Sequence, residues 1–298
     1  MADVGPSAKP PKDPRPAVER IDGLARRILS GDILLPKFQR DFVWERGQIL
    51  DLLDSVYRNY PIGSVLLWQS RQELRSENDI AGLNIDLPKP DYPVNYLLDG
   101  QQRLSVICGA IHWNGSDANS LWNIAFNLRK QTFEHLSTLD ELPPYMIRTN
   151  RLSDPSSFYK QVSTIETLGL EDKEQLKETA DALFNRFKDY FIAVVTLGDM
   201  PLDDVAPIFE RINSTGTPLT IVDLMRAATW SEEFDLIDAI DAIREALDDK
   251  SFGGIDRKVI LRNLSAAAGG GFSAESIDEL RKHDASKLQA ASSDTEDA

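Results

Sequence analysis

Residues 94–103, VNYLLDGQQR, turn from an apolar run through Asp-Gly into an amphipathic segment, and this order constrains the fold more than any other stretch. It predicts a strand, a tight turn and the start of a helix. The first turn of a helix has unpaired backbone N–H groups and a partial positive charge, and Arg103 adds a planar guanidinium suited to bidentate phosphate binding. We therefore predict a phosphate-binding corner here.

Two roles are open to Asp99 at this corner: holding Mg²⁺ against phosphate oxygens, or orienting a water that attacks a phosphoryl group. Gln102 is a second candidate for positioning water. The structural alternative is that Asp99 only caps the helix, contributing about 0.5–2 kcal/mol, while Gly100 supplies the turn and Arg103 points to solvent.

A second candidate is Phe38-Gln39-Arg40, in which an aromatic ring, an amide and a guanidinium follow Pro36. Aromatic stacking beside a hydrogen-bonding amide is a common way to bind a base or a modified sugar-phosphate. The alternative is that Phe38, together with Phe42 and Trp44, belongs to the core.

A third candidate is the segment 209–220, FERINSTGTPLT, which joins two predicted helices through a loop rich in hydroxyls and small residues. Such a loop can donate several N–H and O–H groups to an anion. Equally, Gly216 can end one helix while Thr220 and Asp223 begin the next, without any ligand.

Composition excludes several classes of function. The net charge of −15 disfavours a protein that coats nucleic acid through bulk electrostatics, because such proteins present a strongly basic face. The chain has 3 His and 1 Cys, too few for a zinc site or an HNH-type nuclease centre. It has neither the Gly-rich Lys-Ser/Thr loop of ordinary NTPases nor an apolar run long enough to cross a membrane. We expect a cytoplasmic protein.

The periodicity of the chain predicts helices over 21–29, 49–57 and from 103 to 112 or 113, and strands over 64–68, 94–98 and 122–128. We expect one compact body with four parts. These are a disordered Pro-rich leader (1–17), an α+β core (18–135), a mainly helical part (136–272) with a returning strand near 191–197 and the motif loop at 209–220, and a polar acidic tail (273–298) with too little apolar surface to order.

Three blocks in order, PKFQRDFVW (36–44), LDGQQR (98–103) and FERINSTGTPL (209–219), resemble the N-terminal domain of GmrSD-type modification-dependent restriction enzymes. That family is similar in fold to ParB and sulfiredoxin, which implies an α+β fold with a mixed sheet and helices, followed here by a helical extension. The resemblance implies a nucleotide-handling motif made of Asp99, Gly100, Gln101, Gln102 and Arg103. It also implies that the same cleft is lined by Gln39, Arg40, Arg211 and Asn213.

Members of that family commonly serve anti-phage defence, using an NTP with Mg²⁺ to regulate the cutting of foreign or modified DNA by a nuclease domain or subunit. The resemblance therefore implies a regulatory or sensor subunit of a restriction system, with NTPase activity in which Asp99, Gln102 and Arg103 are catalytic. Fused members continue into a histidine-containing nuclease domain where this sequence has its acidic tail, so we expect a separate nuclease partner. A homo-oligomer is left open.

Two alternatives remain. The chain is a non-enzymatic ParB-like DNA-binding module that holds nucleotide only as a clamp, or it is an interaction or inhibitor protein with a vestigial cleft.

Overall fold

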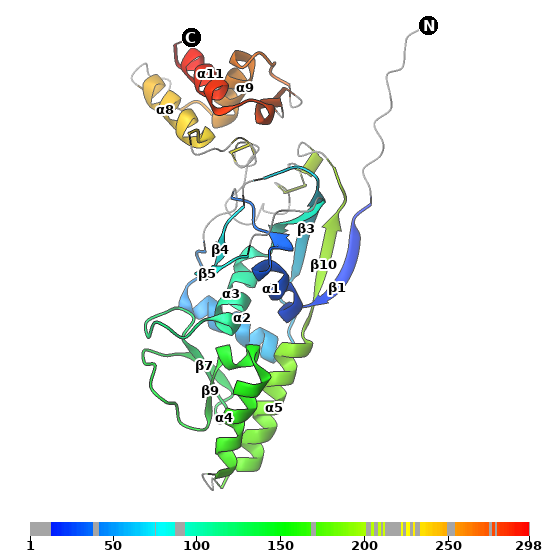
Figure 1. Cartoon of the computed structure of the whole chain (residues 1–298), viewed down its shortest axis with the longest axis vertical. Helices are drawn as coiled ribbons and strands as arrows, with labels where there is room; N and C mark the ends of the chain where they lie inside the picture. The colour runs from blue at the N-terminus through cyan, green and yellow to red at the C-terminus, as the bar shows by residue number, and fades with distance from the viewer. Residues whose placement is uncertain are drawn as a thin grey trace.

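A five-stranded mixed sheet forms the centre of the molecule in the computed structural model (Figure 1). Its strands, in spatial order, are β1 (Arg15–Arg20), β10 (Phe191–Leu197), β3 (Ser64–Ser70), β6 (Val94–Asp99) and β2 (Ile33–Leu34). The pairs β10·β3 and β6·β2 are parallel, and the pairs β1·β10 and β3·β6 are antiparallel. The mixed sheet and the C-terminal helices confirm the predicted α+β class.

The residues that the structure describes are 13–37, 42–74, 76–86, 93–167, 171–200, 204–205, 208–209, 211, 222, 225–226, 229, 233–248, 254–273, 276–277 and 279–297. All statements about the structure refer to these residues.

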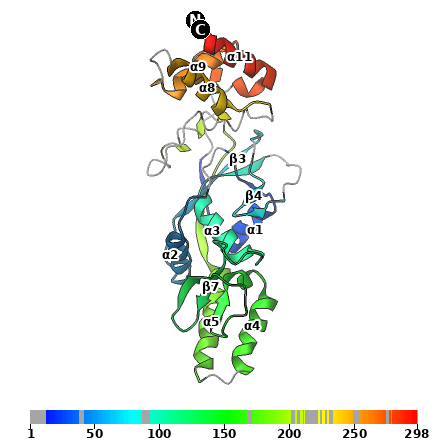
Figure 2. The ribbon, with the colours of Figure 1, turned by 90° about the vertical axis from the view of Figure 1, so that its left-hand side faces the viewer.

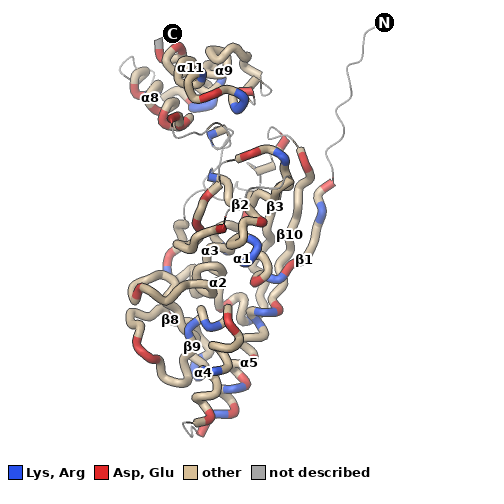
Figure 3. The backbone as a smooth tube through the Cα atoms, viewed as in Figure 1, with Lys and Arg blue, Asp and Glu red and all other residues tan. Residues whose placement is uncertain are grey.

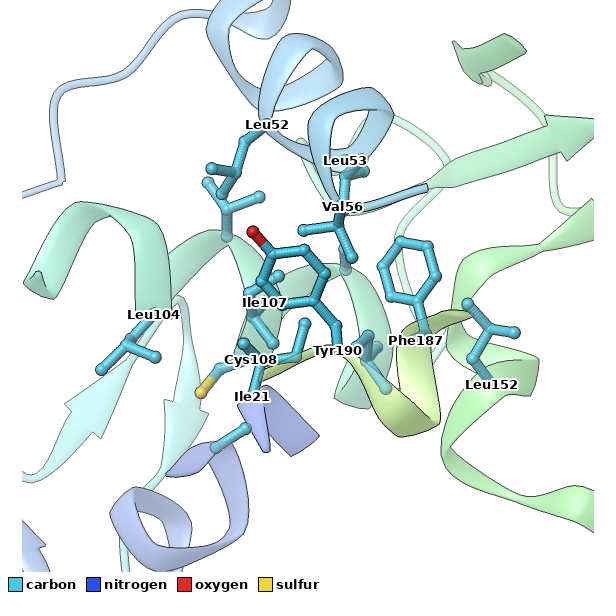
Figure 4. Close-up of a cluster of buried hydrophobic side chains, with 14 of the residues drawn as sticks. Ile21, Leu52, Leu53, Val56, Leu104, Ile107, Cys108, Leu152, Phe187 and Tyr190 are labelled. Atoms are coloured by element: carbon cyan, nitrogen blue, oxygen red, sulfur yellow. The ribbon is translucent and has the colours of Figure 1, made fainter. Parts of the chain in front are cut away.

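One face of the sheet is covered by α1 (Ile21–Leu29), α2 (Arg46–Tyr57) and α3 (Gln101–His112). Successive strand residues point to opposite faces, so Val65 and Leu67 join this core whereas Leu66 and Trp68 join the core on the other face. Burial on both faces explains why β3 and β6 are nearly continuous apolar runs. Figure 4 shows helix side chains such as Val56 converging in the first core.

A second, antiparallel sheet in the order β8-β7-β9 continues the first core beyond the central sheet. Its strands are β7 (Ile124–Asn127), β8 (Thr132–His135) and β9 (Met146–Arg148), and η1 (Thr149–Ser153), α4 (Pro155–Thr167) and α5 (Lys173–Asp189) follow. A short antiparallel hairpin, β4 (Asp79–Ile80) and β5 (Leu83–Asn84), precedes β6 in the sequence.

This second sheet corrects the predicted boundary between 135 and 136. Strand β9 lies beyond that boundary but pairs with β7, and β10 also lies beyond it but pairs with β3. Each of these two pairings joins a strand before residue 135 to a strand after it, so the α+β body continues through β10. Local periodicity does not reveal such long-range pairings.

The C-terminal helices form a separate group on the second core. They are α8 (Leu236–Asp248), α9 (Arg257–Ala267), the short η3 (Glu279–Lys282) and α11 (Ala285–Asp297). The views of Figures 1 and 2 place them at one end of the molecule and α4 and α5 at the other, so the chain is elongated rather than one compact body. The predicted polar tail, 273–298, is wrong over α11, because Leu288 and Ala291 are buried against this group.

The predicted leader, 1–17, is also too long. Residues 15–17 belong to β1, which pairs along its whole length with β10, although most of its side chains are exposed. Backbone hydrogen bonds therefore hold this strand, and an apolar pattern is not needed to form it. No helix among the described residues is long and apolar enough to span a membrane.

Candidate functional site

The predicted strand-turn-helix corner is present, and Gly100 makes it possible. Strand β6 ends at Asp99, Gly100 has φ of 107°, and α3 begins at Gln101. A Cβ on Gly100 would lie 3.2 Å from Cγ2 of Val65, so both the dihedral angle and the close packing favour glycine. The N-cap position of α3 is Gly100, which has no side chain to act as a cap, and Oδ2 of Asp99 accepts from Arg103 instead.

Arg103 folds back over the corner instead of pointing to solvent. Its Nη2 donates to Oδ2 of Asp99 at 2.9 Å, and its Nη1 donates to the carbonyl oxygen of Ile62 at 2.8 Å. The Arg103 side chain is 17% exposed and that of Asp99 is 34% exposed. The guanidinium is therefore held at a fixed position beside the start of α3, with further N–H groups that these two bonds do not use.

A second glycine makes room for this arrangement. Gly63 has φ of 89°, and a Cβ built there would coincide with Nη1 of Arg103. The sequence Pro61-Ile62-Gly63 predicts only the end of α2, so the part that Ile62 and Gly63 take in the site was missed. Ile62 and Arg103 are 41 positions apart in the sequence, so no local sequence pattern indicates that they are in contact.

Gln102 connects the corner to the first of the three sequence blocks. Its Oε1 accepts a hydrogen bond from the backbone N–H of Val43 at 3.0 Å. The neighbouring Phe42 packs on Trp122, with ring centroids 5.2 Å apart. The blocks at 36–44 and 98–103 therefore meet in space, as a shared site requires.

Gln101 carries a polar atom that the described protein leaves unsatisfied. Its Oε1 is buried and has no hydrogen-bond partner among the described residues. A buried acceptor without a partner costs about 1–3 kcal/mol, so such an atom is a natural contact for a ligand or a bound water.

Of the remaining predicted site residues, only Arg211 lies within the described part of the chain. Gln39, Arg40 and Asn213 lie outside the described residues. Arg211 is helical and exposed, and no hydrogen bond or ion pair joins it to the corner within the described part of the chain. Its neighbour Phe209 is fully buried in the same cluster as Leu98 of β6, which brings the start of the third block against the sheet.

A pocket of about 460 Å³ is lined in part by Phe42 and was not predicted from the sequence. Aromatic rings of Trp113 and Trp122 line it together with the carboxylates of Asp79 and Asp117. Its described lining contains no Lys or Arg, so it suits an uncharged or cationic group better than a phosphate.

Metal ligands are sparse. No group of three or more His, Cys, Asp or Glu side chains able to hold a metal ion occurs in the described ranges. A Mg²⁺ ion that is shared with substrate phosphates needs only one or two protein carboxylates, and the carboxylate at the corner is that of Asp99, which also pairs with Arg103.

Comparison with known proteins gives two findings. The family model described as the GmrSD restriction endonuclease N-terminal domain matches residues 21–230. An uncharacterized protein of Methanocaldococcus jannaschii is 28% identical over an alignment of 263 positions, which covers 71% of this chain and 43% of the relative. The chain thus spans less than half the length of this curated relative. The family match includes all three sequence blocks and the corner itself.

Proposed function

The chain belongs to the family of GmrSD restriction endonuclease N-terminal domains, and on that premise we propose that it is the nucleotide-binding regulatory or sensor subunit of a DNA restriction system. In this proposal it binds an NTP with Mg²⁺ at the Asp99–Arg103 corner, hydrolyses it slowly, and acts in the cytoplasm. A separate nuclease subunit cuts foreign or modified DNA.

The observation that carries the proposal is the fixed guanidinium beside a helix start whose N-cap residue is a glycine. Arg103 is oriented by Asp99 and by the Ile62 carbonyl, and the N–H groups of α3 begin at the same corner. A phosphate placed there would meet a positive helix end and a preoriented charged donor, which is the arrangement that stabilises phosphoryl groups.

Each residue of the motif then has a distinct part. Arg103 neutralises charge on the transferred phosphate, and Gly100 and Gln101 bring the chain close to it. Asp99 uses Oδ2 to orient Arg103, so Oδ1 would be the atom left to hold Mg²⁺, which would supply positive charge against the phosphate. Gln102 is tied to Val43 by Oε1, so its orientation depends on the segment that precedes α2.

The few His and Cys residues of this sequence offer little material for a metal-dependent nuclease centre, so the proposal places DNA cleavage outside this part of the protein. The whole sequence has 3 His and 1 Cys, and Cys108 is buried in the core. The net charge of −15 further favours a sensor that contacts DNA over a limited area instead of along an extended basic face.

The test is nucleotide binding and phosphate release with Mg²⁺ for ATP, GTP, CTP and UTP, with and without unmodified and modified DNA. Arg103→Gln removes the charged fork, and Arg262→Gln removes an exposed arginine from α9 as a charge-matched control. We expect Arg103→Gln to weaken nucleotide binding at least tenfold and the control to bind as the parent does. Thermal unfolding of both variants separates loss of the site from loss of the fold.

Three outcomes discriminate between the functions. Turnover that depends on Arg103 and responds to DNA supports the NTPase sensor. Arg103-dependent binding without turnover favours the ParB-like clamp, a reading consistent with the two bonds that already occupy Arg103. No nucleotide binding by the parent protein would overturn the proposal and leave the interaction or inhibitor protein.

A further inference from the structure

A second pocket, of about 250 Å³, lies between α4 and the segment 141–151. It is far from the C-terminal helices, at the end of the molecule where Figure 1 shows α4 and α5. Its described lining contains three cationic side chains and one carboxylate: Arg148, Arg151, Lys160 and Glu141. Figure 3 shows basic positions along β9 and α4 at this end. A cationic pocket is unexpected in a chain whose net charge is −15.

None of the three cations forms an ion pair within the described residues. Nη2 of Arg148 donates to the carbonyl oxygens of Thr138 at 2.8 Å and Asp140 at 3.1 Å, which are uncharged acceptors. Burial lowers the pKa of the Arg148 guanidinium, the charge of Arg151 lowers it further, and the charge of Asp140 opposes both. Like charges are therefore held close together, and the nearby carboxylates do not pair with them directly.

The uncharged polar groups of the pocket already have partners. The hydroxyl of Ser157 donates to Oδ2 of Asp154 at 2.6 Å, and Nε2 of Gln161 donates to the carbonyl oxygen of Met146 at 2.7 Å. These bonds fix the walls of the pocket. The donors that remain for a ligand are the charged N–H groups of Arg151 and Lys160, and such donors form their strongest hydrogen bonds with anions.

We propose that this pocket binds a phosphate group, as a second anion site separate from the Asp99–Arg103 corner. An arginine fork and a lysine ammonium are the usual protein donors to phosphate, and a surplus of two positive charges suits a phosphate better than a single carboxylate. The volume accommodates one phosphate with part of its ester. The phosphate belongs either to a DNA backbone or to a free phosphorylated small molecule.

The site is tested by calorimetric titration with pyrophosphate. The pocket variant is Arg151→Gln with Lys160→Gln, and both residues are exposed, so the fold tolerates the change. The matched control is Arg262→Gln with Lys287→Gln, two exposed cations in the C-terminal helices outside any described ion pair. We expect pyrophosphate affinity to fall at least tenfold in the pocket variant and to stay unchanged in the control.

A fluorescent DNA duplex, titrated at several salt concentrations, identifies the source of the phosphate. If the backbone occupies the pocket, the pocket variant lowers the slope of log affinity against log salt by roughly 1–2, because each lost phosphate contact removes about one unit. If pyrophosphate binding is lost but DNA binding is unchanged, the source is a small molecule.

The proposal is overturned if the parent protein binds no pyrophosphate, if the pocket and control variants lose affinity equally, or if polyglutamate displaces pyrophosphate from the parent at equal charge concentration. The Arg103→Gln protein keeps the pocket intact. Comparison of the Arg103→Gln protein with the pocket variant therefore distinguishes a failure of the proposed nucleotide site from a failure of this phosphate site.

Discussion

At the scale of single residues, the site requires glycine, which has no Cβ atom, at two positions. Gly63 leaves the space that Nη1 of Arg103 occupies, Gly100 packs closely on Val65, and each has a positive φ that other residues adopt at a cost. The Arg103 side chain is therefore positioned by the carbonyl oxygen of Ile62 and by the missing Cβ at Gly63, as well as by the Asp99 carboxylate. A change at Gly63 acts on Arg103 without altering any charged group.

Gly63→Ala is expected to displace Arg103, whereas Gly82→Ala provides the matched control. Gly82 has φ of 74° and open space around its Cβ position, so its substitution costs only the backbone strain of about 1–2 kcal/mol. Gly63→Ala carries a similar strain and also expels the guanidinium, so it should unfold at lower denaturant and bind nucleotide more weakly. Equal unfolding midpoints and equal nucleotide affinities for the two variants would contradict this geometry.

His112, the last residue of α3, is expected to make stability depend on pH. Burial lowers its pKa below the usual 6.5; Asp22 opposes that shift, and Arg26 and Lys188 add to it. The unfolded chain takes up a proton near pH 6.5 that the folded protein resists, so this contribution to stability is complete above pH 6.5 and is lost as the pH falls. The slope attributable to His112 reaches at most about 1.4 kcal/mol per pH unit.

The measurement is urea unfolding between pH 8 and pH 5 for the parent and for His112→Gln. The difference in unfolding free energy between them should be constant above pH 7 and should shrink or reverse below pH 6. A difference that does not change with pH would exclude His112 as the source.

At the scale of elements, periodicity predicts those that bury one regular face. The apolar spacing of α1 places Ile21, Leu24 and Ile28 in the core, and the predicted span 21–29 is confirmed. Strand β1 was missed because its stability comes from pairing with a strand that is distant in the sequence. Helix α11 was missed because few of its side chains are buried, such as Leu288 and Ala291, so its sequence lacks a broad apolar face. Likewise, the Asp-Gly corner follows from local residue order, whereas the Arg103 contact with Ile62 requires the tertiary fold.

Leu288 is expected to be the largest apolar contact that holds α11 on its neighbours. The side chain is 1% exposed, and Leu288→Ala should cost about 2–5 kcal/mol of local stability. Lys287→Ala alters the exposed neighbouring position and should have little effect. Hydrogen exchange of α11 and α9 reports the change; protection that survives Leu288→Ala would show that α11 does not depend on this contact.

At the scale of the whole molecule, the two faces of the central sheet belong to two different cores. The face with α1, α2 and α3 continues into β7, α4 and α5, whereas Leu66, Trp68 and Leu98 join the cluster that extends to α8, α9 and α11. The corner at Asp99 ends a strand that contributes to both cores. Strand β6 therefore connects both cores to the strand end that carries Asp99.

Strand β10 lies between β1 and β3, although it is the last strand of that sheet in the sequence. During synthesis, the ribosome releases β1 and β3 long before residues 191–197, so neither finds its neighbour on that side until most of the α+β body has been made. Pairings so distant in sequence form slowly, and an exposed strand edge invites association with other chains. Newly made copies thus pass through an interval in which the sheet is open, and chaperones that shield strand edges would raise the yield of folded protein.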